Sequence, residues 1–330
     1  MGYCIVGVSA VKNEADIIEA NVRHNLRYLD RMIVLDHDSC DATPRILQSL
    51  VDEGLPLTIS RLGTPDPSFK QAQFTTALAR GAFEKCAADY VMPFDADEFI
   101  RAPSRDALEA ALNDTKTDVT NMRWQTYVPS AHGERGHPLR SLRWRVETAK
   151  DPLCKAILSR RVLERDWRIG RGNHVVFEQV GDKLSWTAGE ALQGVTLAHL
   201  PLRSPEQLAA KVLVGWLARR LTYGPKAATT TNSWHMRELF QRVVSGEAIT
   251  ARDVHDYAIG IYALGRLPSA ADAGLFTLVE DQVAEAMPLR YTGETPIDAA
   301  RQLAVWGSQL LDTLGQSAEG PPSSEEPARA

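Results

Sequence analysis

The stretch from Asp89 to Arg101 (Asp-Tyr-Val-Met-Pro-Phe-Asp-Ala-Asp-Glu-Phe-Ile-Arg) places a short apolar run directly before three carboxylates. The apolar residues are Tyr90, Val91, Met92 and Phe94, and the carboxylates are Asp95, Asp97 and Glu98. A run of this length and composition predicts a buried strand. Open α/β sheets bind ligands outside the carboxyl ends of their strands, so acids at this position predict a site at that edge of a sheet.

The acidic pair Asp95 and Asp97 is a candidate metal site. Two residues apart, these side chains point the same way if the strand continues, and such a pair suits a divalent cation that also holds phosphate oxygens. The pattern is short, and roughly one match is expected by chance in a chain of this length. A second match, Asp36-His37-Asp38, does occur. The position after a buried strand favours a metal site at Asp95 and Asp97.

Strands alternate with helices along the first hundred residues. Apolar runs predict strands over 3–9, 32–35, 57–60 and 90–94, and helical spacing predicts helices over 14–29, 45–51 and 74–88. This alternation predicts an α/β fold with a mostly parallel sheet and helices on both faces. Pro93 lacks a donor for the strand ladder, which predicts a bulge or an edge there. The chain contains no Gly-x-Gly-x-x-Gly after the first strand and no Walker loop, which argues against a dinucleotide dehydrogenase and a P-loop NTPase.

The composition is that of a globular protein with no electrostatic preference for nucleic acid. Of 330 residues, 24% are charged and 44% hydrophobic, with a net charge of −5. No apolar run approaches the length of a membrane span, and no basic segment precedes a signal-peptide core. The four cysteines are scattered without metal-ligand spacing. We therefore expect a cytoplasmic protein with reduced cysteines, no membrane span and no nucleic-acid partner.

The chain changes character near Ser204. Ser204-Pro205-Glu206-Gln207 has the pattern of a helix start, and helical periodicity follows over 208–216, 236–244, 251–264, 275–286 and 297–314. The last residues are rich in Gly, Pro, Ser and Glu, which is typical of disorder. We predict an α/β domain over 1–204, a helical C-terminal region over 205–315 and a disordered tail over 316–330.

Five segments, taken in order, resemble the GT-A nucleotide-sugar glycosyltransferases of the family 2-like group. They are 11–18 (Val-Lys-Asn-Glu-Ala-Asp-Ile-Ile), 35–43 (Leu-Asp-His-Asp-Ser-Cys-Asp-Ala-Thr), 94–99 (Phe-Asp-Ala-Asp-Glu-Phe), 169–174 (Ile-Gly-Arg-Gly-Asn-His) and 199–204 (His-Leu-Pro-Leu-Arg-Ser). The resemblance spans roughly residues 3–212, and five ordered matches are far more specific than one. His37 and Asp38 depart from the usual Asp/Asn and Gly, which leaves the base preference open.

The resemblance implies that residues 1–204 form a GT-A catalytic domain. Such a domain transfers a sugar from a nucleotide-diphosphate donor to a saccharide or other hydroxyl acceptor, and we expect inversion at the anomeric centre. It further implies a Mn²⁺ or Mg²⁺ held by Asp95, Asp97 and His199, where the histidine would favour Mn²⁺. The candidate donor-binding residues are Asn13, Glu14, Asp36, Asp38, Lys70 and Asp95. Glu98 is the first candidate for the general base and Glu178 the second.

Two further features of the sequence each allow two interpretations. Ten basic residues between 140 and 171 form either a solvated face or a cationic wall for a diphosphate or an anionic acceptor. They are Arg140, Arg143, Arg145, Lys150, Lys155, Arg160, Arg161, Arg165, Arg168 and Arg171. His174 is either a loop histidine with its own partners or part of the active site.

Two other functions are compatible with the sequence. A sugar nucleotidyltransferase could use a similar sheet and acidic metal site, but it would release pyrophosphate. A non-catalytic sugar- or partner-binding protein would depend mainly on its helical C-terminal half. Binding of a nucleotide diphosphate with Mn²⁺, and the identity of the released product, distinguish the three.

Overall fold

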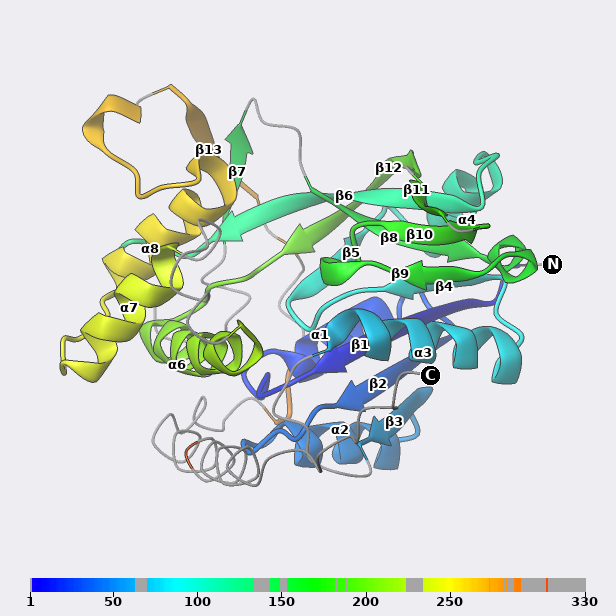
Figure 1. The fold of residues 1–330 in the computed structure, drawn as a ribbon, viewed down its shortest axis with the longest axis horizontal. Helices are drawn as coiled ribbons and strands as arrows, with labels where there is room; N and C mark the ends of the chain where they lie inside the picture. The colour runs from blue at the N-terminus through cyan, green and yellow to red at the C-terminus, as the bar shows by residue number, and fades with distance from the viewer. Residues whose placement is uncertain are drawn as a thin grey trace, which may run out of the picture.

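The computed structural model describes residues 2–62, 70–132, 143–148, 153–181, 183–187, 189–223, 234–272, 274–281, 283, 288–291 and 307. Its centre is a ten-stranded sheet with the order β13-β7-β6-β8-β4-β1-β2-β3, in which β12 pairs with β6 and β5 (Figure 1). The first strands are β1 (Ile5–Val11), β2 (Arg31–Asp36), β3 (Leu57–Arg61), β4 (Tyr90–Pro93) and β5 (Glu98–Arg101). The later strands are β6 (Val119–Val128), β7 (Trp144–Thr148), β8 (Cys154–Ser159), β12 (Glu190–His199) and β13 (Phe276–Glu280).

The N-terminal strands form the parallel part of this sheet. β4, β1, β2 and β3 are mutually parallel neighbours, whereas β8 joins β4 in the antiparallel sense. A separate three-stranded antiparallel sheet contains β9 (Trp167–Ile169), β10 (Val176–Val180) and β11 (Lys183–Thr187). The predicted α/β fold with a parallel sheet at its centre is confirmed.

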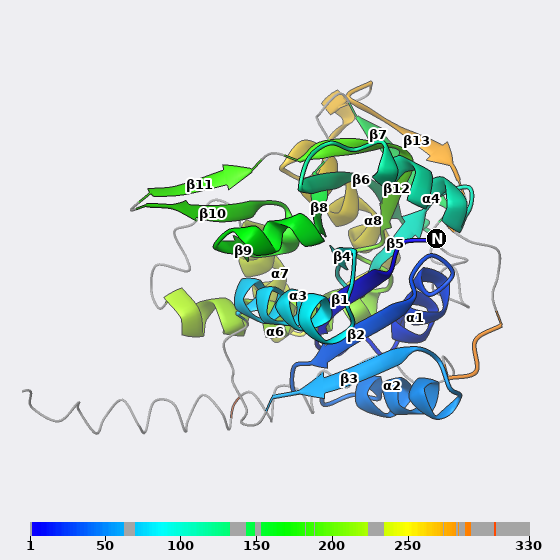
Figure 2. The ribbon, with the colours of Figure 1, turned by 90° about the vertical axis from the view of Figure 1, so that its right-hand side faces the viewer.

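Strand β1 is buried along its whole length because helices cover both faces of the sheet. Its residues alternate between two hydrophobic cores: Ile5 and Val11 belong to one, and Val6 and Val8 to the other. The first core includes α1 (Ile18–Asn25), α2 (Thr43–Asp52) and α4 (Arg105–Asn113), and the second includes α3 (Gln71–Lys85). Figure 2 shows α3 on the opposite side of the strands from α1 and α2.

The break at Pro93 agrees with the sequence prediction of an edge. β4 ends at Pro93, and β8 pairs only with Tyr90 and Val91. The amide of Phe94 donates to the carbonyl of Val8 on β1. Successive residues of a strand point their amides to opposite neighbours, so the nitrogen of Pro93 faces the β8 side, where pairing has already ended and no donor is needed. Since the strand ends there, Asp95 and Asp97 lie in the turn between β4 and β5. The assumption that the strand continues through them is wrong.

In the part of the C-terminal region that the structure describes, the elements are helical except for β13. It contains α6 (Pro205–Tyr223), α7 (Trp234–Val244) and α8 (Ala251–Ile259), which continues into a π-helical turn, Gly260–Leu264. Ser204 Oγ accepts a hydrogen bond from the amide of Gln207, which confirms the predicted helix start. The helix predicted over 275–286 is wrong, because β13 instead pairs with β7 at the edge of the large sheet. The predicted helix over 297–314 and the tail over 316–330 lie outside the described residues, apart from residue 307.

None of the helices in the described residues combines the length and the apolar character that crossing a bilayer requires.

Candidate functional site

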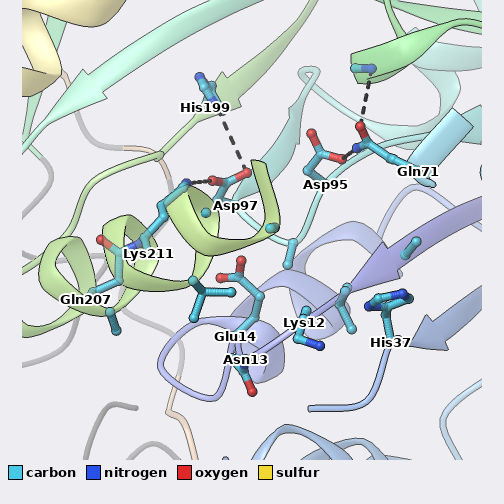
Figure 3. A pocket seen from close by; sticks show the side chains of 18 of the residues that line it. Lys12, Asn13, Glu14, His37, Gln71, Asp95, Asp97, His199, Gln207 and Lys211 are labelled. Atoms are coloured by element: carbon cyan, nitrogen blue, oxygen red, sulfur yellow. Dashed lines mark hydrogen bonds and ion pairs between the residues drawn. The ribbon is translucent and has the colours of Figure 1, made fainter. Parts of the chain in front are cut away.

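A cavity of about 410 Å³ lies at the carboxyl ends of β1, β2 and β4, against α6 (Figure 3). One wall follows β1 and includes Lys12, Asn13 and Glu14, and the other belongs to α6 and includes Gln207 and Lys211. The remaining polar and aromatic lining consists of His37, Gln71, Asp95, Asp97, Trp124, His174, His199 and Tyr262. The position matches the edge at which the sequence predicts a site.

The pairing of β5 with β12 brings Asp97 and His199 together. His199 is opposite Glu98 in the antiparallel register, and the amide of Leu200 donates to the Asp97 carbonyl over 2.8 Å. Asp97 Oδ1 then lies 3.9 Å from His199 Nε2, and its Oδ2 lies 3.4 Å from Lys211 Nζ. Burial would raise the pKa of Asp97, but the positive charges of Lys211 and Arg203 outweigh it and hold the pKa well below the ordinary value. Asp97 is therefore an ionised carboxylate facing the cavity.

Aromatic rings fix the orientation of His199. Its imidazole stacks on Trp124, with ring centroids 4.0 Å apart, and meets the edge of Tyr262 at 5.0 Å. Burial lowers the pKa of His199 to about 3, so the ring is neutral at physiological pH. Its Nδ1 is buried without a hydrogen-bond partner. A neutral imidazole held in this way is ready to act as a ligand.

The second carboxylate of the motif has a different environment. Asp95 accepts hydrogen bonds of 2.7 Å from both Lys155 Nζ and Gln71 Nε2. Lys155 is completely buried and also lies 3.1 Å from Glu98 Oε1. Glu98 is equally buried, and its other oxygen accepts from the amide of Asp95. Burial raises the pKa of Glu98 well above the ordinary value, although Lys155 opposes this. Asp95, Glu98 and Lys155 thus form a charge cluster at the base of the motif.

The loops after β1 and β2 are joined by hydrogen bonds between the two segments that carry the family resemblance. The side-chain oxygen of Asn13 accepts from the amide of Cys40, and Ser39 Oγ accepts from the amide of Asn13. Asn13 has a φ of 58°, a left-handed conformation that asparagine tolerates better than most residues. Thr43 Oγ1 accepts from the amide of Glu14. Several motif residues therefore shape the cavity wall through contacts with one another.

Arg203 connects this wall to the end of β12. The buried guanidinium donates to Asp16 over 2.6 Å and to Glu14 over 2.8 Å, and it lies 3.9 Å from Asp97. Burial raises the pKa of Glu14 to about 7, against the opposing charge of Arg203.

The residues present fit a divalent cation at Asp97 and His199. Ligand atoms of Asp97, Glu98 and His199 all lie within 4.8 Å of one another. The 3.9 Å between Asp97 and His199 is too long for a hydrogen bond, yet it is short enough for both atoms to contact one ion. An ionised carboxylate and a neutral imidazole are also the protonation states that coordination requires.

The structure brings some of the predicted site residues together and leaves others apart. Asn13, Glu14, Asp95, Asp97 and His199 line the cavity. Five predicted residues do not line it: Asp36, Asp38, Lys70, Glu98 and Glu178. Asp36 is buried and accepts from the amide of Ser39, and Glu178 lies on β10, paired with Arg165 at 2.8 Å.

The basic stretch between 140 and 171 does not form one cationic wall at this cavity. Lys155 is buried beneath it, Arg160 donates to the carbonyls of Phe83 and Ala88, and Arg161 pairs with Asp118. None of the described members of the stretch lines the cavity. Arg140 and Lys150 lie outside the described residues.

Sequence reasoning missed several residues of the site. Lys211, Gln71 and Tyr262 line the cavity but lie in helices, where a polar or aromatic residue has no distinctive spacing. Lys155 belongs to the basic stretch, but nothing in the sequence distinguishes it from its neighbours. His174 was predicted with two roles; it lines the cavity, and its Nδ1 lies 2.7 Å from the Cys154 carbonyl oxygen.

Comparisons with known proteins give similarity only at the level of structure. No family model matches the chain, and neither does any curated protein. S. aureus TarS 1–349 in complex with UDP is 14% identical over 73% of this chain and 72% of that chain, with a TM-score of 0.35. The mannosyltransferase PcManGT from Pyrobaculum calidifontis, in complex with GDP-Man and Mn²⁺, is 16% identical over 94% of this chain and 81% of that chain, with a TM-score of 0.39. Because both TM-scores are below 0.5, these likenesses carry no argument about the fold or the activity of this chain.

Proposed function

We propose that this protein is a divalent-metal-dependent glycosyltransferase that uses a nucleotide-diphosphate sugar as donor. The observation that carries the proposal is the arrangement of Asp97 and His199. An ionised carboxylate and a neutral imidazole face each other at 3.9 Å, without a hydrogen bond, at the carboxyl ends of a parallel sheet. Sheets of this kind bind their ligands at this edge.

The residues around the pair suit a diphosphate. A Mn²⁺ or Mg²⁺ held by Asp97 and His199, with Glu98 nearby, would stabilise the negative charge that develops on the leaving nucleotide diphosphate. Lys211 directs its ammonium group toward Asp97 from α6 (Figure 3) and supplies a positive charge on the cavity wall. Its second contact, 3.0 Å to the Pro201 carbonyl oxygen, holds the side chain in that position.

The opposite wall suits the nucleoside part of the donor. Asn13 and Glu14 line it, and the hydrogen bonds between the two motif loops keep it in shape. Asp36 and Asp38 follow β2 outside the cavity lining, and Lys70 immediately precedes α3. For these three we propose a supporting role in donor binding, through the loops that carry them.

The general base stays a prediction. Inverting transfer requires a group that accepts the proton of the acceptor hydroxyl, and neither Glu98 nor Glu178 lines the cavity. Substituting each with Gln and measuring kcat tests the two candidates. A general base should reduce kcat by about two orders of magnitude or more when it is removed.

Calorimetric titration with GDP and UDP, with and without Mn²⁺, tests the proposed donor site. We expect one of them to bind at least tenfold more tightly with Mn²⁺ and Asp97→Asn to remove that difference. Gln48→Ala, an exposed change on α2, is the matched control. Equal binding with and without Mn²⁺ would contradict the metal role, and release of pyrophosphate from a sugar phosphate and NTP would indicate a nucleotidyltransferase.

A further inference from the structure

A second cavity lies beside the first, on the outer side of α3. It has a volume of about 520 Å³ and is formed by α3 together with β9 and β10. Gln71 and Gly172 line the first cavity, and their sequence neighbours Ala72 and Arg171 line the second. Gln71 Oε1 accepts a hydrogen bond from the amide of Gly172, which joins the two segments at the boundary between the cavities. We call the second cavity, with the adjoining outer face of β9–β11, the α3 groove.

The α3 groove is cationic although the whole chain is acidic. Arg80, Arg168 and Arg171 line it, and among the described lining residues none is acidic. Arg80 lies 3.5 Å from Asp166, whose side chain is 76% exposed. Arg168 and Arg171 are both exposed on the surface. Guanidinium groups bind carboxylate, phosphate and sulfate oxygens with paired hydrogen bonds.

Aromatic side chains extend the groove across the three-stranded sheet. Arg168, Phe177 and Trp186 are directly opposite one another on β9, β10 and β11. Residues in such register share one face, and the Arg168 guanidinium lies 5.8 Å from the centre of the Phe177 ring. Trp186 is 63% exposed, and Figure 2 shows β10 and β11 projecting beyond α3.

The opposite face of the three-stranded sheet packs in the core, whereas the face with Arg168, Phe177 and Trp186 does not. Trp167, Ile169 and Val176 are buried in the core against α3. The sheet is therefore already anchored by its inner face, and the outer aromatic residues are not needed for that packing. An exposed tryptophan and an arginine on the same face of a sheet provide an apolar surface for a sugar ring and a charge for its anionic substituents.

We propose that the α3 groove binds the acceptor, and that the acceptor is an anionic glycan. The inference rests on the proposed transferase function and adds the substrate class. The anionic groups of the glycan would pair with Arg168 and Arg171, its sugar rings would pack on Phe177 and Trp186, and its hydroxyl end would reach the first cavity past Gln71 and Gly172. A neutral glycan would offer these arginines no anionic group to bind.

Direct binding of defined probes tests the groove without any donor. Calorimetry would compare oligogalacturonate (carboxylate groups), dextran sulfate (sulfate groups) and neutral dextran, with single-stranded oligonucleotide as a fourth probe. We expect at least one anionic glycan to bind at least tenfold more tightly than dextran and the oligonucleotide. We also expect its binding to weaken several-fold between about 50 and 200 mM NaCl, because salt screens exposed charges strongly over this range.

Substitutions in the groove locate the binding surface. Arg168→Ala combined with Arg171→Ala should weaken glycan binding by about tenfold to a hundredfold, and Trp186→Ala should weaken it several-fold. Arg27→Ala, which removes an exposed arginine at a different cavity, is the matched control and should leave binding unchanged. Circular dichroism and thermal melting of each variant would show that the fold is intact.

The outcomes separate this inference from the proposed function. If GDP or UDP binds with Mn²⁺ but neither anionic glycan binds more tightly than dextran, the acceptor assignment is wrong and the transferase proposal stands. The same conclusion follows if the groove variants bind glycan with the affinity of the wild type. Tighter binding of the oligonucleotide also overturns the assignment. If glycan binds in the groove but no nucleotide diphosphate binds, the groove is a glycan site and the transferase proposal fails.

Discussion

Asp95 and Asp97 belong to one short motif but occupy opposite environments. The carboxylate of Asp95 is the more exposed of the two, yet it makes two hydrogen bonds of 2.7 Å with Gln71 and Lys155. The carboxylate of Asp97 is nearly buried, and its distances to nitrogen atoms of side chains are longer, 3.4 Å to Lys211 and 3.9 Å to the neutral His199 and to Arg203. A buried charge without short hydrogen bonds costs free energy unless something else compensates.

The two acids of the motif therefore differ in what their side chains contact. Asp95 is joined to Lys155 at the turn between β4 and β5, while Asp97 faces the cavity and is the residue that we propose to hold the metal. The side chains of α1 strengthen the structural half: Asn21 and Asn25 donate to the Glu98 carbonyl, and His24 Nε2 lies 2.7 Å from the Ile100 carbonyl oxygen. Substitutions at Asp95 and its partner Lys155 should therefore change the free energy of unfolding, and substitutions at Asp97 should change the affinity for a ligand.

The largest effect is expected at Lys155. Lys155→Met leaves Asp95 and Glu98 without their shared cation, and Glu98 is completely buried. Removing one partner of a buried charge pair costs about 3–5 kcal/mol. Urea denaturation would measure this loss. Adding Asp95→Asn should restore part of it because Asp95 is the carboxylate that pairs with Lys155 at 2.7 Å and the amide carries no charge. A loss below about 1 kcal/mol would show that the cluster is not structural.

The next effect is the pH dependence contributed by His24. Burial lowers its pKa to about 4 from an ordinary value of 6.5, so the unfolded chain takes up the proton first as pH falls. The stabilisation is complete above pH 6.5 and is lost between pH 6.5 and about 4, a total of about 3 kcal/mol. Denaturation at several pH values should show a flatter profile for His24→Gln, which keeps a donor for the Ile100 carbonyl. Identical profiles would mean that His24 does not titrate with folding.

A smaller but more discriminating effect concerns metal affinity. Asp97→Asn should weaken Mn²⁺ binding by at least about tenfold, whereas Asp95→Asn should change it by less than about threefold because Asp95 is occupied by Lys155 and Gln71. Titration followed by electron paramagnetic resonance of Mn²⁺ would measure both. Equal losses would restore the prediction that Asp95 is also a metal ligand.

The smallest change in stability is expected at Lys211. Its side chain is one-third exposed, and its contact with Asp97 is 3.4 Å long, so Lys211→Met should alter the free energy of unfolding by less than about 1 kcal/mol. The same substitution should weaken GDP or UDP binding several-fold. A large loss of stability would show that Lys211 contributes to the fold, as Lys155 does, and would contradict this prediction.

The sequence predicted much of the N-terminal fold and part of the site. Alternating apolar runs indicated the strands around β1, β2, β3 and β4, and the acids after β4 indicated the edge where the cavity lies. The same reasoning was wrong for 275–286, because the short strand β13 gains its stability by pairing with β7, which lies more than a hundred residues earlier. It also placed Asp36 and Glu178 in the site, although neither lines the cavity.

What the sequence determined by itself was local: which segments are buried, where they end, and that Asp95 and Asp97 follow a strand end. Tertiary structure alone decided which acid is bonded to Lys155 and Gln71 and which faces His199, because these three residues reach the motif from β8, α3 and β12. The physical reason is that the free energy of a buried charge depends on partners brought by distant strands and helices, and short-range sequence patterns do not carry that information.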